Sequence, residues 1–394
     1  MVAKSAASAA APARPRFGFH PDPELSATMP STYYFDPAIF EREKETIFYK
    51  TWQFVGYAWD VREPGSFITA DIIDQKVFVI RGKDGRLRAF YNVCMHRGHT
   101  LLEGKGQKGV ITCPFHAWSY DATGALKAAG NAENVAGFRH ADFSLTEVKV
   151  EELGLLVFVN LSNDARSLSE TCGGIVDEFK KIIPRYDRLY NARRDPYPIK
   201  ANWKFVLDGM ECYHCPIIHP QIMGSGGDTY LVPAWDVVER EFWSTHYTKA
   251  DPKAIARNKD KLPYDFDLND EVKDSAIWWI WPNMLFVAHR GPSNLKVFHI
   301  VPTGPETCIQ YIDNLIADDP PSAKNLSNMN YYRDILQPQD ITAMEQQQLG
   351  AHARGYRQGR LMVDKERSWR SEHGTHHFQR LVWESLHGPN YDAA

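Results

Sequence analysis

Two short pairs of cysteine and histidine residues constrain this chain more than any other feature of its sequence. Cys94 and His96 form a C-x-H pair, and after sixteen intervening residues Cys113 and His116 form a C-x-x-H pair. Two thiolates and two imidazoles in this arrangement suit a [2Fe–2S] cluster in which the cysteines bind one iron and the histidines bind the other. Zinc sites tend instead to group like ligands, as C-x-x-C followed by H-x-x-x-H. The mixed pairs therefore favour an iron–sulfur cluster and predict electron transfer.

The residues around both pairs resemble the cluster-binding loops of Rieske domains. Arg97-Gly98 follows the first pair, whereas Trp118-Ser119-Tyr120 and Gly124 follow the second pair. One residue departs from the family pattern, because Ala117 stands where Rieske domains usually have glycine. By this resemblance, both pairs supply cluster ligands from the loop tips of an antiparallel β domain.

A glycine pattern between the two pairs resembles a nucleotide-binding motif. Gly104, Gly106 and Gly109 form a literal G-x-G-x-x-G, which in dinucleotide-binding folds follows a strand and opens a helix. Here the next residues, 110–112, have the pattern of a strand. We therefore expect a surface turn between two strands and no nicotinamide site.

The composition excludes several classes of function. The chain has 394 residues, which is long enough for two domains with a large core. A net charge of −4 gives no electrostatic reason to expect nucleic acid or an anionic membrane as a partner. Six cysteines are too few for a disulfide framework at this length, which favours a cytoplasmic protein. Met1 to Pro15 lacks the apolar core of a signal peptide, and no stretch approaches the roughly eighteen apolar residues of a membrane span.

The N-terminal part of the chain is expected to contain two segments. Residues 1–31 are predicted to form a mobile tail. Residues 32–51 are predicted to contain a helix that packs on the catalytic domain, with Asp36 as its N-cap and Pro37 in its first turn.

The rest of the chain divides into two domains. Short strands between Gly, Asp and Asn turns predict an antiparallel β domain, the Rieske domain, over residues 52–162. Residues 163–394 combine strands with helices, the last two beginning near residues 342 and 375. We therefore predict an α+β protein whose second domain has an antiparallel sheet flanked by helices.

A second set of histidines points to another metal site. His214 and His219 are five residues apart, so on a regular helix they would project about 140° apart and could not share one metal ion. Pro216 between them should end or kink the helix and let His219 turn toward His214. Two imidazoles and one carboxylate, with other positions open, are the ligand set of non-haem Fe(II) enzymes that activate oxygen.

This stretch resembles the mononuclear-iron motif of Rieske non-haem iron oxygenases, the aromatic-ring-hydroxylating dioxygenase family, whose alpha subunits hold both sites in one chain. The resemblance extends from about residue 32 to 386. It implies that His214 and His219 are iron ligands and that Glu211 is the electron-transfer bridge to a cluster histidine, His116. In the family this bridge joins neighbouring subunits, which implies a homotrimer. Glutamate at this position is the form seen in the subgroup that acts on carnitine and betaines.

The third iron ligand must come from further along the chain. Gln339-Asp340 and Glu345 resemble the carboxylate motif of the family, which implies Asp340 as the ligand; Glu345 and Asp334 are weaker candidates. Residue types alone leave a different interpretation open. Asp340 could be an acidic residue at a helix N-terminus, with Thr342 and Glu345 as a capping box.

The two metal sites together imply an oxygenase. A Rieske cluster transfers one electron at a time, whereas substrate oxidation by O2 at Fe(II) takes two electrons from outside. The sequence has no flavin or nicotinamide motif, so the resemblance implies a separate flavin and iron–sulfur reductase that uses NADH or NADPH. A Rieske electron carrier without oxygenase activity is the alternative, but it would not need His214, His219 and Asp340.

The candidate substrate contacts are three tryptophans in an expected strand. Alternation places Trp279 and Trp281 on one face and Trp278 on the other. Aromatic rings can hold a quaternary ammonium by cation–π attraction, worth about 1–2 kcal/mol per contact. Ordinary packing across a sheet explains the three residues equally well. Arg290 and Lys296, close in sequence, could bind a carboxylate.

The family subgroup suggests the reaction. The sequence around Glu211 is similar to oxygenases that demethylate glycine betaine, stachydrine or carnitine. We therefore expect a monooxygenase that N-demethylates a small quaternary or tertiary amine, and hydroxylation of an aromatic ring or aromatic acid is the alternative.

Overall fold

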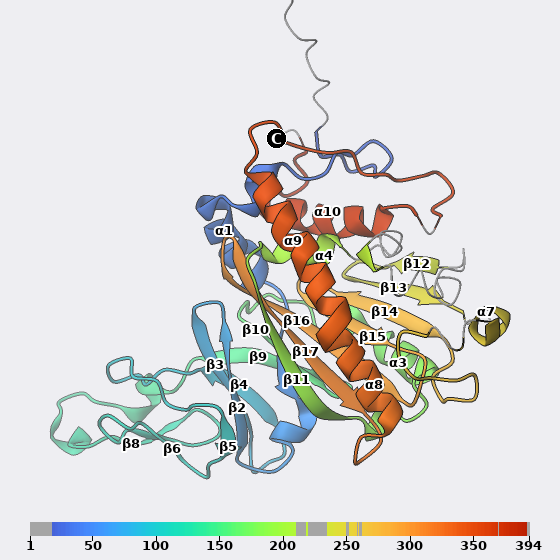
Figure 1. Ribbon diagram of the computed structural model, residues 1–394. Helices are drawn as coiled ribbons and strands as arrows, with labels where there is room; N and C mark the ends of the chain where they lie inside the picture. The colour runs from blue at the N-terminus through green and yellow to red at the C-terminus, as the bar shows by residue number, and fades with distance from the viewer. Residues whose placement is uncertain are drawn as a thin grey trace, which may run out of the picture.

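The computed structural model describes residues 18–209, 218–219, 235–249, 252–257, 259, 262–368 and 370–391. These residues form two seven-stranded antiparallel sheets, one three-stranded sheet and several helices (Figure 1). The predicted α+β fold, with an antiparallel sheet in each domain, is confirmed.

The first domain contains one large sheet and the small sheet. The strands of the large sheet lie in the order β1-β10-β9-β4-β3-β2-β5. They are Gln53–Tyr57 (β1), Ser66–Ile72 (β2), Gln75–Arg81 (β3), Leu87–Tyr91 (β4), Lys105–Gln107 (β5), Glu147–Leu153 (β9) and Leu156–Asn160 (β10). The small sheet comprises Ile111–Thr112 (β6), Ser119–Tyr120 (β7) and Leu126–Ala128 (β8). The glycine pattern forms β5 and the turn before β6, so no helix opens there.

The second domain contains the other large sheet, in the order β11-β17-β16-β15-β14-β13-β12. Its strands are Tyr190–Ile199 (β11), Trp235–Glu239 (β12), Trp243–Thr248 (β13), Ser275–Ile280 (β14), Met284–Ala288 (β15), Asn294–Gly304 (β16) and Thr307–Ile316 (β17). Along β16, alternate side chains enter two separate apolar clusters, because successive residues of a strand point to opposite faces.

Different helices cover the two faces of this sheet. On one face lie α2 (Leu168–Cys172) and α3 (Ile175–Ile182), which Gly173 and Gly174 separate. On the other face lie the helices α4 (Trp203–Asp208), α8 (Ala323–Tyr331), α9 (Gln337–Ala351) and α10 (His373–His387). We call this second face the α9 face. A short helix, α7 (Pro252–Arg257), contributes Ile255 to the same apolar cluster.

The N-terminal helix is tied to the α9 face by a buried ion pair. It begins as predicted, since the Asp36 carboxylate accepts the N–H of Ala38 at 2.8 Å, and it comprises α1 (Pro37–Glu43) and a π-helical turn, Lys44–Phe48. Glu43 and Lys204 are fully buried, and Lys204 Nζ lies 2.6 Å from Glu43 Oε1. The pair therefore fixes the N-terminal helix to α4.

The prediction of a mobile tail over residues 1–31 was wrong for the part from Gly18 onward. The Phe19 ring is buried and lies 5.3 Å from the Trp383 ring of α10. The Met29 N–H donates to Gln379 Oε1 at 3.0 Å. The apolar residues of this segment pack on a helix that is distant in the sequence. The composition of the segment alone cannot predict this contact.

The two domains share one apolar core. Phe54 and Tyr57 of β1 belong to the same buried cluster as Trp278 and Phe286 of the second sheet. The Tyr57 hydroxyl also donates to Asp313 Oδ2 of β17 at 2.6 Å. A large apolar interface resists relative domain motion. The loops around β6 and β8 therefore have a fixed position at the far end of the first domain, away from α9 (Figure 1).

Within the described residues, none of the helices is long and apolar enough to span a bilayer.

Candidate metal centres

The two loops that carry the Cys/His pairs have the same backbone geometry. In each loop the cysteine N–H donates to the carbonyl oxygen five residues later, and the N–H four residues after the cysteine donates to the cysteine carbonyl. These distances are 2.8 and 3.0 Å in both the Cys94 loop and the Cys113 loop. The fourth residue has a positive φ in each, 75° at Gly98 and 57° at Ala117. The departure from glycine at Ala117 therefore places an L side chain in the left-handed region, at a cost of about 1–2 kcal/mol.

The cysteine and histidine side chains of these loops differ in their exposure to solvent. The thiols of Cys94 and Cys113 are buried and form no disulfide. The imidazoles of His96 and His116 are exposed, and their ring centroids are 4.8 Å apart. Two enclosed thiols and two adjacent outer imidazoles fit a [2Fe–2S] cluster with its cysteine-bound iron inside and its histidine-bound iron at the surface.

Two further side chains contact this site. The Tyr120 hydroxyl lies 3.4 Å from Cys94 Sγ and accepts the Met95 N–H at 3.1 Å. Burial and the Cys94 contact raise the pKa of Tyr120, so its hydroxyl remains a donor toward sulfur. Hydrogen bonds to sulfur are one of the means by which proteins tune cluster potentials. Partial desolvation, and then the Arg97 guanidinium, lower the pKa of His116, which keeps that imidazole neutral and able to bind a metal.

The predicted mononuclear site brings together two residues that are far apart in sequence. His219 is 3% exposed, and its Nε2 lies 2.9 Å from Asp340 Oδ1. Its Nδ1 lies 2.8 Å from Gln339 Oε1. One ring nitrogen thus faces the carboxylate, while the carboxamide holds the other, as outer partners of metal-binding histidines do.

The structure bears out one half of the alternative interpretation of Asp340 and contradicts the other, because Asp340 lies in the first turn of α9 but the capping box is absent. The helix α9 begins at Gln337, and a π-helical turn, Tyr332–Leu336, precedes it. Thr342 therefore lies inside the helix, where its hydroxyl donates to the Pro338 carbonyl at 2.7 Å and forms no capping box. π-Helical insertions occur frequently at functional sites.

The remaining sequence candidates fall into two groups. Glu211 and His214 lie outside the described residues, as do the neighbouring cysteines. Of the weaker candidates, Glu345 accepts the Lys200 N–H at 3.0 Å, and Asp334 pairs with Arg333 at 2.7 Å. Within the described part of the chain, no group of three or more His, Cys, Asp or Glu side chains converges on one metal position.

Asp208, at the end of α4, is a buried carboxylate that no sequence pattern identified. Its carboxylate accepts the Tyr34 hydroxyl at 2.5 Å and the Gln379 amide at 3.0 Å. Desolvation raises the pKa of Asp208 to about 6, against the opposing effect of these two hydrogen bonds. The carboxyl group holds the end of α4, from which the chain continues to His219, against α10.

The three tryptophans occupy the two faces as alternation predicts. Trp279 and Trp281 lie in the cluster of the α9 face, with ring centroids 6.1 Å apart. Trp278 lies on the opposite face and donates to Glu178 Oε2 at 2.9 Å. The position of Trp278 does not support the suggested substrate role, because Asp340 lies on the other side of the sheet.

Both domains match known families. Residues 51–139 match the Rieske [2Fe-2S] domain, and residues 186–388 match the catalytic domain of the ring hydroxylating alpha subunit. The carnitine monooxygenase oxygenase subunit of Acinetobacter baumannii is 35% identical over 369 residues, which cover 92% of this chain and 96% of that protein. The chloroplastic choline monooxygenase of Amaranthus tricolor is 29% identical and covers 93% of this chain and 80% of its own length.

A solved structure supports the same relationship. The quaternary ammonium Rieske monooxygenase in complex with L-carnitine superposes with a TM-score of 0.81 at 33% identity, covering 93% of this chain and 98% of that one. A [2Fe–2S] domain joined to a catalytic domain that implies mononuclear iron excludes the alternative of a Rieske electron carrier without oxygenase activity. This chain belongs to the Rieske non-haem iron oxygenases and is a catalytic subunit of that family.

Proposed function

We propose that this protein oxidises a carbon bonded to the nitrogen of a small quaternary ammonium compound, with N-demethylation as the expected outcome. The observation that carries this proposal is that its relatives are named for carnitine and choline, which share a quaternary ammonium group and otherwise differ. The His219–Asp340 contact supports it, because it joins two of the three proposed iron ligands.

The residues have the following proposed roles. Cys94, His96, Cys113 and His116 hold the [2Fe–2S] cluster; His214, His219 and Asp340 hold Fe(II); and Glu211 connects the iron site to a cluster histidine. When bound, the cluster supplies single electrons and the iron supplies oxygen activation. Gln339 accepts the Nδ1–H of His219, which leaves the Nε2 lone pair available for a metal.

The overall reaction consumes O2, two electrons and two protons, and it yields one water and a hydroxylated carbon next to nitrogen. Collapse of that product breaks the C–N bond and releases an aldehyde, a tertiary amine and a proton. If the attacked carbon is a methyl group, the aldehyde is formaldehyde. The electrons come from NADH or NADPH through a separate reductase with flavin and iron–sulfur groups, and the oxygenase subunits assemble as a homotrimer.

The test is product analysis with a surrogate reductase. O2 uptake, formaldehyde and tertiary amine are measured with L-carnitine, glycine betaine, choline and benzoate. An aldehyde and an amine formed in step with O2 uptake from a quaternary ammonium support the proposal. Oxidation of benzoate alone would contradict it.

The bridging role of Glu211 has its own test. The Glu211→Ala variant should retain about three irons per chain, two in the cluster and one mononuclear, and lose nearly all coupled turnover. Iron analysis and single-turnover assays of the reduced protein separate these two effects. Normal turnover in this variant would refute the bridging role.

A further inference from the structure

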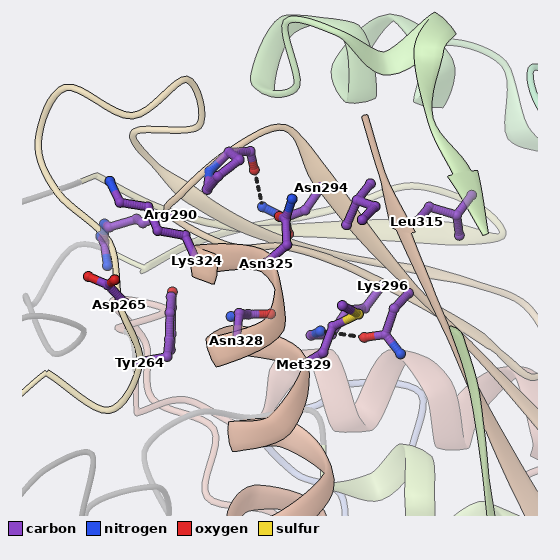
Figure 2. A pocket seen from close by; sticks show the side chains of 13 residues that line it. Tyr264, Asp265, Arg290, Asn294, Lys296, Leu315, Lys324, Asn325, Asn328 and Met329 are labelled. Carbon is purple, nitrogen blue, oxygen red and sulfur yellow. Dashed lines mark hydrogen bonds between the residues drawn. The ribbon is translucent and has the colours of Figure 1, made fainter. Parts of the chain in front are cut away.

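Two groups of buried basic side chains on the α9 face are not among the proposed metal ligands. The first is Lys296 of β16, which is 2% exposed and lines a pocket of about 10 Å³ beside α8 (Figure 2). Its Nζ donates to Asn314 Oδ1 at 2.7 Å. The pocket has room for about one water molecule, so it does not support the suggested role of Lys296 in binding a carboxylate.

The second group consists of three histidines, which we call the histidine cluster: His246 on β13, and His373 and His377 on α10. Each of them is at most 5% exposed. His373 and His377 are four residues apart and therefore lie on the same side of α10. The His246 ring lies against the first turn of this helix, since a Cβ on Gly374 would be 3.3 Å from its Cε1 and Nε2 atoms. The Trp279 ring lies 5.3 Å from the ring of His377.

Each ring of the cluster has a buried nitrogen without a hydrogen-bond partner. His377 Nε2 lies 3.2 Å from the Glu241 carbonyl, to which only a protonated nitrogen can donate, so Nδ1 of the neutral ring is a lone pair. This Nδ1, His373 Nδ1 and His246 Nε2 have no partner in the described part of the chain. The three rings do not converge on a metal position among the described residues. A proton added to one of these nitrogens would therefore be buried without an acceptor, which is unfavourable.

The position of the cluster also opposes a positive charge. Burial, and then the proximity of His373 and His377, lower the pKa of His246 to about 4. Burial lowers the pKa of His377 to about 4 as well, although its hydrogen bond to the Glu241 carbonyl acts in the opposite direction. Burial and then Arg367 lower the pKa of His373. Because His373 is the first residue of α10, the positive end of the helix dipole disfavours protonation there.

The surrounding groups do not compensate for a charge on the cluster. The neighbours of His246 on β12 and β14 are Val237 and Ile277, which are apolar. The other titratable groups lie on α10, on the segment before it and on β12: His376, Arg380, Glu384, Asp364, Arg367, Glu372 and Glu239. Their carboxylates interact with other residues: Glu384 with Arg380, Asp364 with Ser368, Glu372 with Met362, and Glu239 with Arg367. Asp364 and Glu384 raise the pKa values of His373 and His377, but less than burial lowers them.

The helix that rests on the cluster also holds the end of α4. The Thr375 hydroxyl of α10 donates to the Asp208 carbonyl at 3.2 Å, and the Gln379 amide donates to the Asp208 carboxylate at 3.0 Å. The chain continues from Asp208 to His219. Release of α10 from the sheet would therefore also remove the contacts that fix the start of this segment.

We propose that the histidine cluster is an acid-sensitive switch, which holds α10 on the sheet while its rings are neutral and releases this helix when they bind protons. A histidine that becomes exposed regains its ordinary pKa of about 6.5, so the docked state is fully stable above about pH 6.5 and loses stability as the pH falls toward 4. The switch goes beyond the proposed reaction, and only its effect on the iron site rests on the proposed function.

Hydrogen exchange of the holoenzyme at pH 7.5 and pH 5 tests the switch, after correction for the intrinsic pH dependence of exchange. With pKa values of about 4 and 6.5, one histidine makes opening about 30-fold more favourable at pH 5 than at pH 7.5. The amides of α10 in the wild type should therefore lose more than about 100-fold of their protection, while those of β3 and β4 keep theirs. No loss in α10, or an equal loss in β3 and β4, would overturn the switch.

Two single variants and one control assign the effect to the cluster. His246→Gln and His377→Gln each remove one titrating ring, and the amide introduced at position 377 can still donate to the Glu241 carbonyl. Each variant should reduce the loss of protection at pH 5 by about 30-fold. His140→Gln, at an exposed position of the first domain, should behave as the wild type does. A loss of protection in both cluster variants equal to that in the wild type would overturn the inference.

The effect on the iron site is measured separately, as mononuclear iron per cluster at the same two pH values. Acid also protonates the proposed iron ligands, so only the difference between the wild type and His246→Gln reports on the switch. Better iron retention at pH 5 in the variant supports the connection through α4, and equal retention would overturn that connection. Neither measurement uses product formation, so a failure of the proposed reaction would change neither result.

Discussion

The Nδ1 atom of His219 lies 2.8 Å from Oε1 of Gln339, and the next residue, Asp340, lies 2.9 Å from Nε2 of the same ring. Two successive residues of one helix thus contact the two nitrogens of one imidazole. Because a carboxamide oxygen accepts only a proton-bearing nitrogen, Gln339 selects the tautomer with its free lone pair on Nε2. The helix thus fixes the orientation of the proposed ligand.

Replacing Gln339 should weaken iron binding without unfolding the protein. Gln339→Leu removes the acceptor for Nδ1, and loss of such an outer partner lowers metal affinity by about 10–100-fold. The measurement is mononuclear iron per cluster after dialysis against a graded chelator. Gln347→Leu, at an exposed position of the same helix, is the control. Iron retention equal to the wild type in Gln339→Leu would show that the contact does not orient the ligand.

Replacing Lys296 should make the fold more stable at neutral pH. Its pKa is about 7 in the folded protein and about 10.4 in the unfolded chain. Between these values the unfolded chain binds more protons, so wild-type stability rises with pH, and below pH 7 the full penalty remains. Lys296→Met removes this penalty, which is roughly 4 kcal/mol at pH 7, but it leaves Asn314 without its hydrogen-bond partner, at a cost of about 1–3 kcal/mol. The variant should therefore be more stable than the wild type by about 1–3 kcal/mol.

Urea denaturation of wild type and Lys296→Met at pH 7.0 and 9.5 measures this effect. The advantage of the variant should shrink at the higher pH, where the wild-type lysine is neutral in the folded state. A variant less stable than wild type at both pH values would indicate that the lysine supports the fold.

Asp208 should show the opposite pH dependence. Its pKa is about 6 in the folded protein and about 3.9 in the unfolded chain. Between these values the folded protein binds more protons, so stability falls as pH rises toward 6, and the penalty persists above it. Asp208→Asn should therefore gain about 1–2 kcal/mol at pH 7.5 and nothing at pH 4. Thermal unfolding at both pH values checks this, and an equal gain at both would contradict the assigned pKa.

Ala117→Gly should stabilise the second cluster loop by about 1 kcal/mol. The residue has a φ of 57°, which glycine adopts without a Cβ clash. The readout is the temperature at which the visible absorbance of the cluster disappears. Ala141→Gly, in an exposed turn without a positive φ, should lower that temperature slightly and serves as the control. A lower temperature for Ala117→Gly would contradict the strain.

Local patterns predicted the parts of the molecule that depend on near neighbours. The Cys94 and Cys113 pairs lie in short loops, the strands follow alternation, and Asp36 caps a helix next to it. The pairing of His219 with Asp340 was predicted through a family resemblance, because no local rule joins residues so far apart in sequence.

Other features depend on contacts that no local pattern contains. The burial of Lys296 without an acidic partner among the described residues cannot be predicted from the sequence. A lysine in a strand is normally expected to be solvated. The docking of Phe19 on Trp383 joins the two ends of the chain. The sequence predicted a helix that begins near residue 342, whereas α9 begins at Gln337, directly after a π-helical turn. No capping residue marks this earlier start.

The core shared by Phe54 and Tyr57 with the second sheet has a consequence for the timing of catalysis. In electron carriers with a hinged head group, the swing of that head group can limit the rate. Here the described part of the first domain shares its core with the second sheet, so a reductase would meet one fixed surface of the oxygenase. We therefore expect the rate of electron supply to depend on how reductase molecules bind and leave that surface, and not on a movement between the two domains.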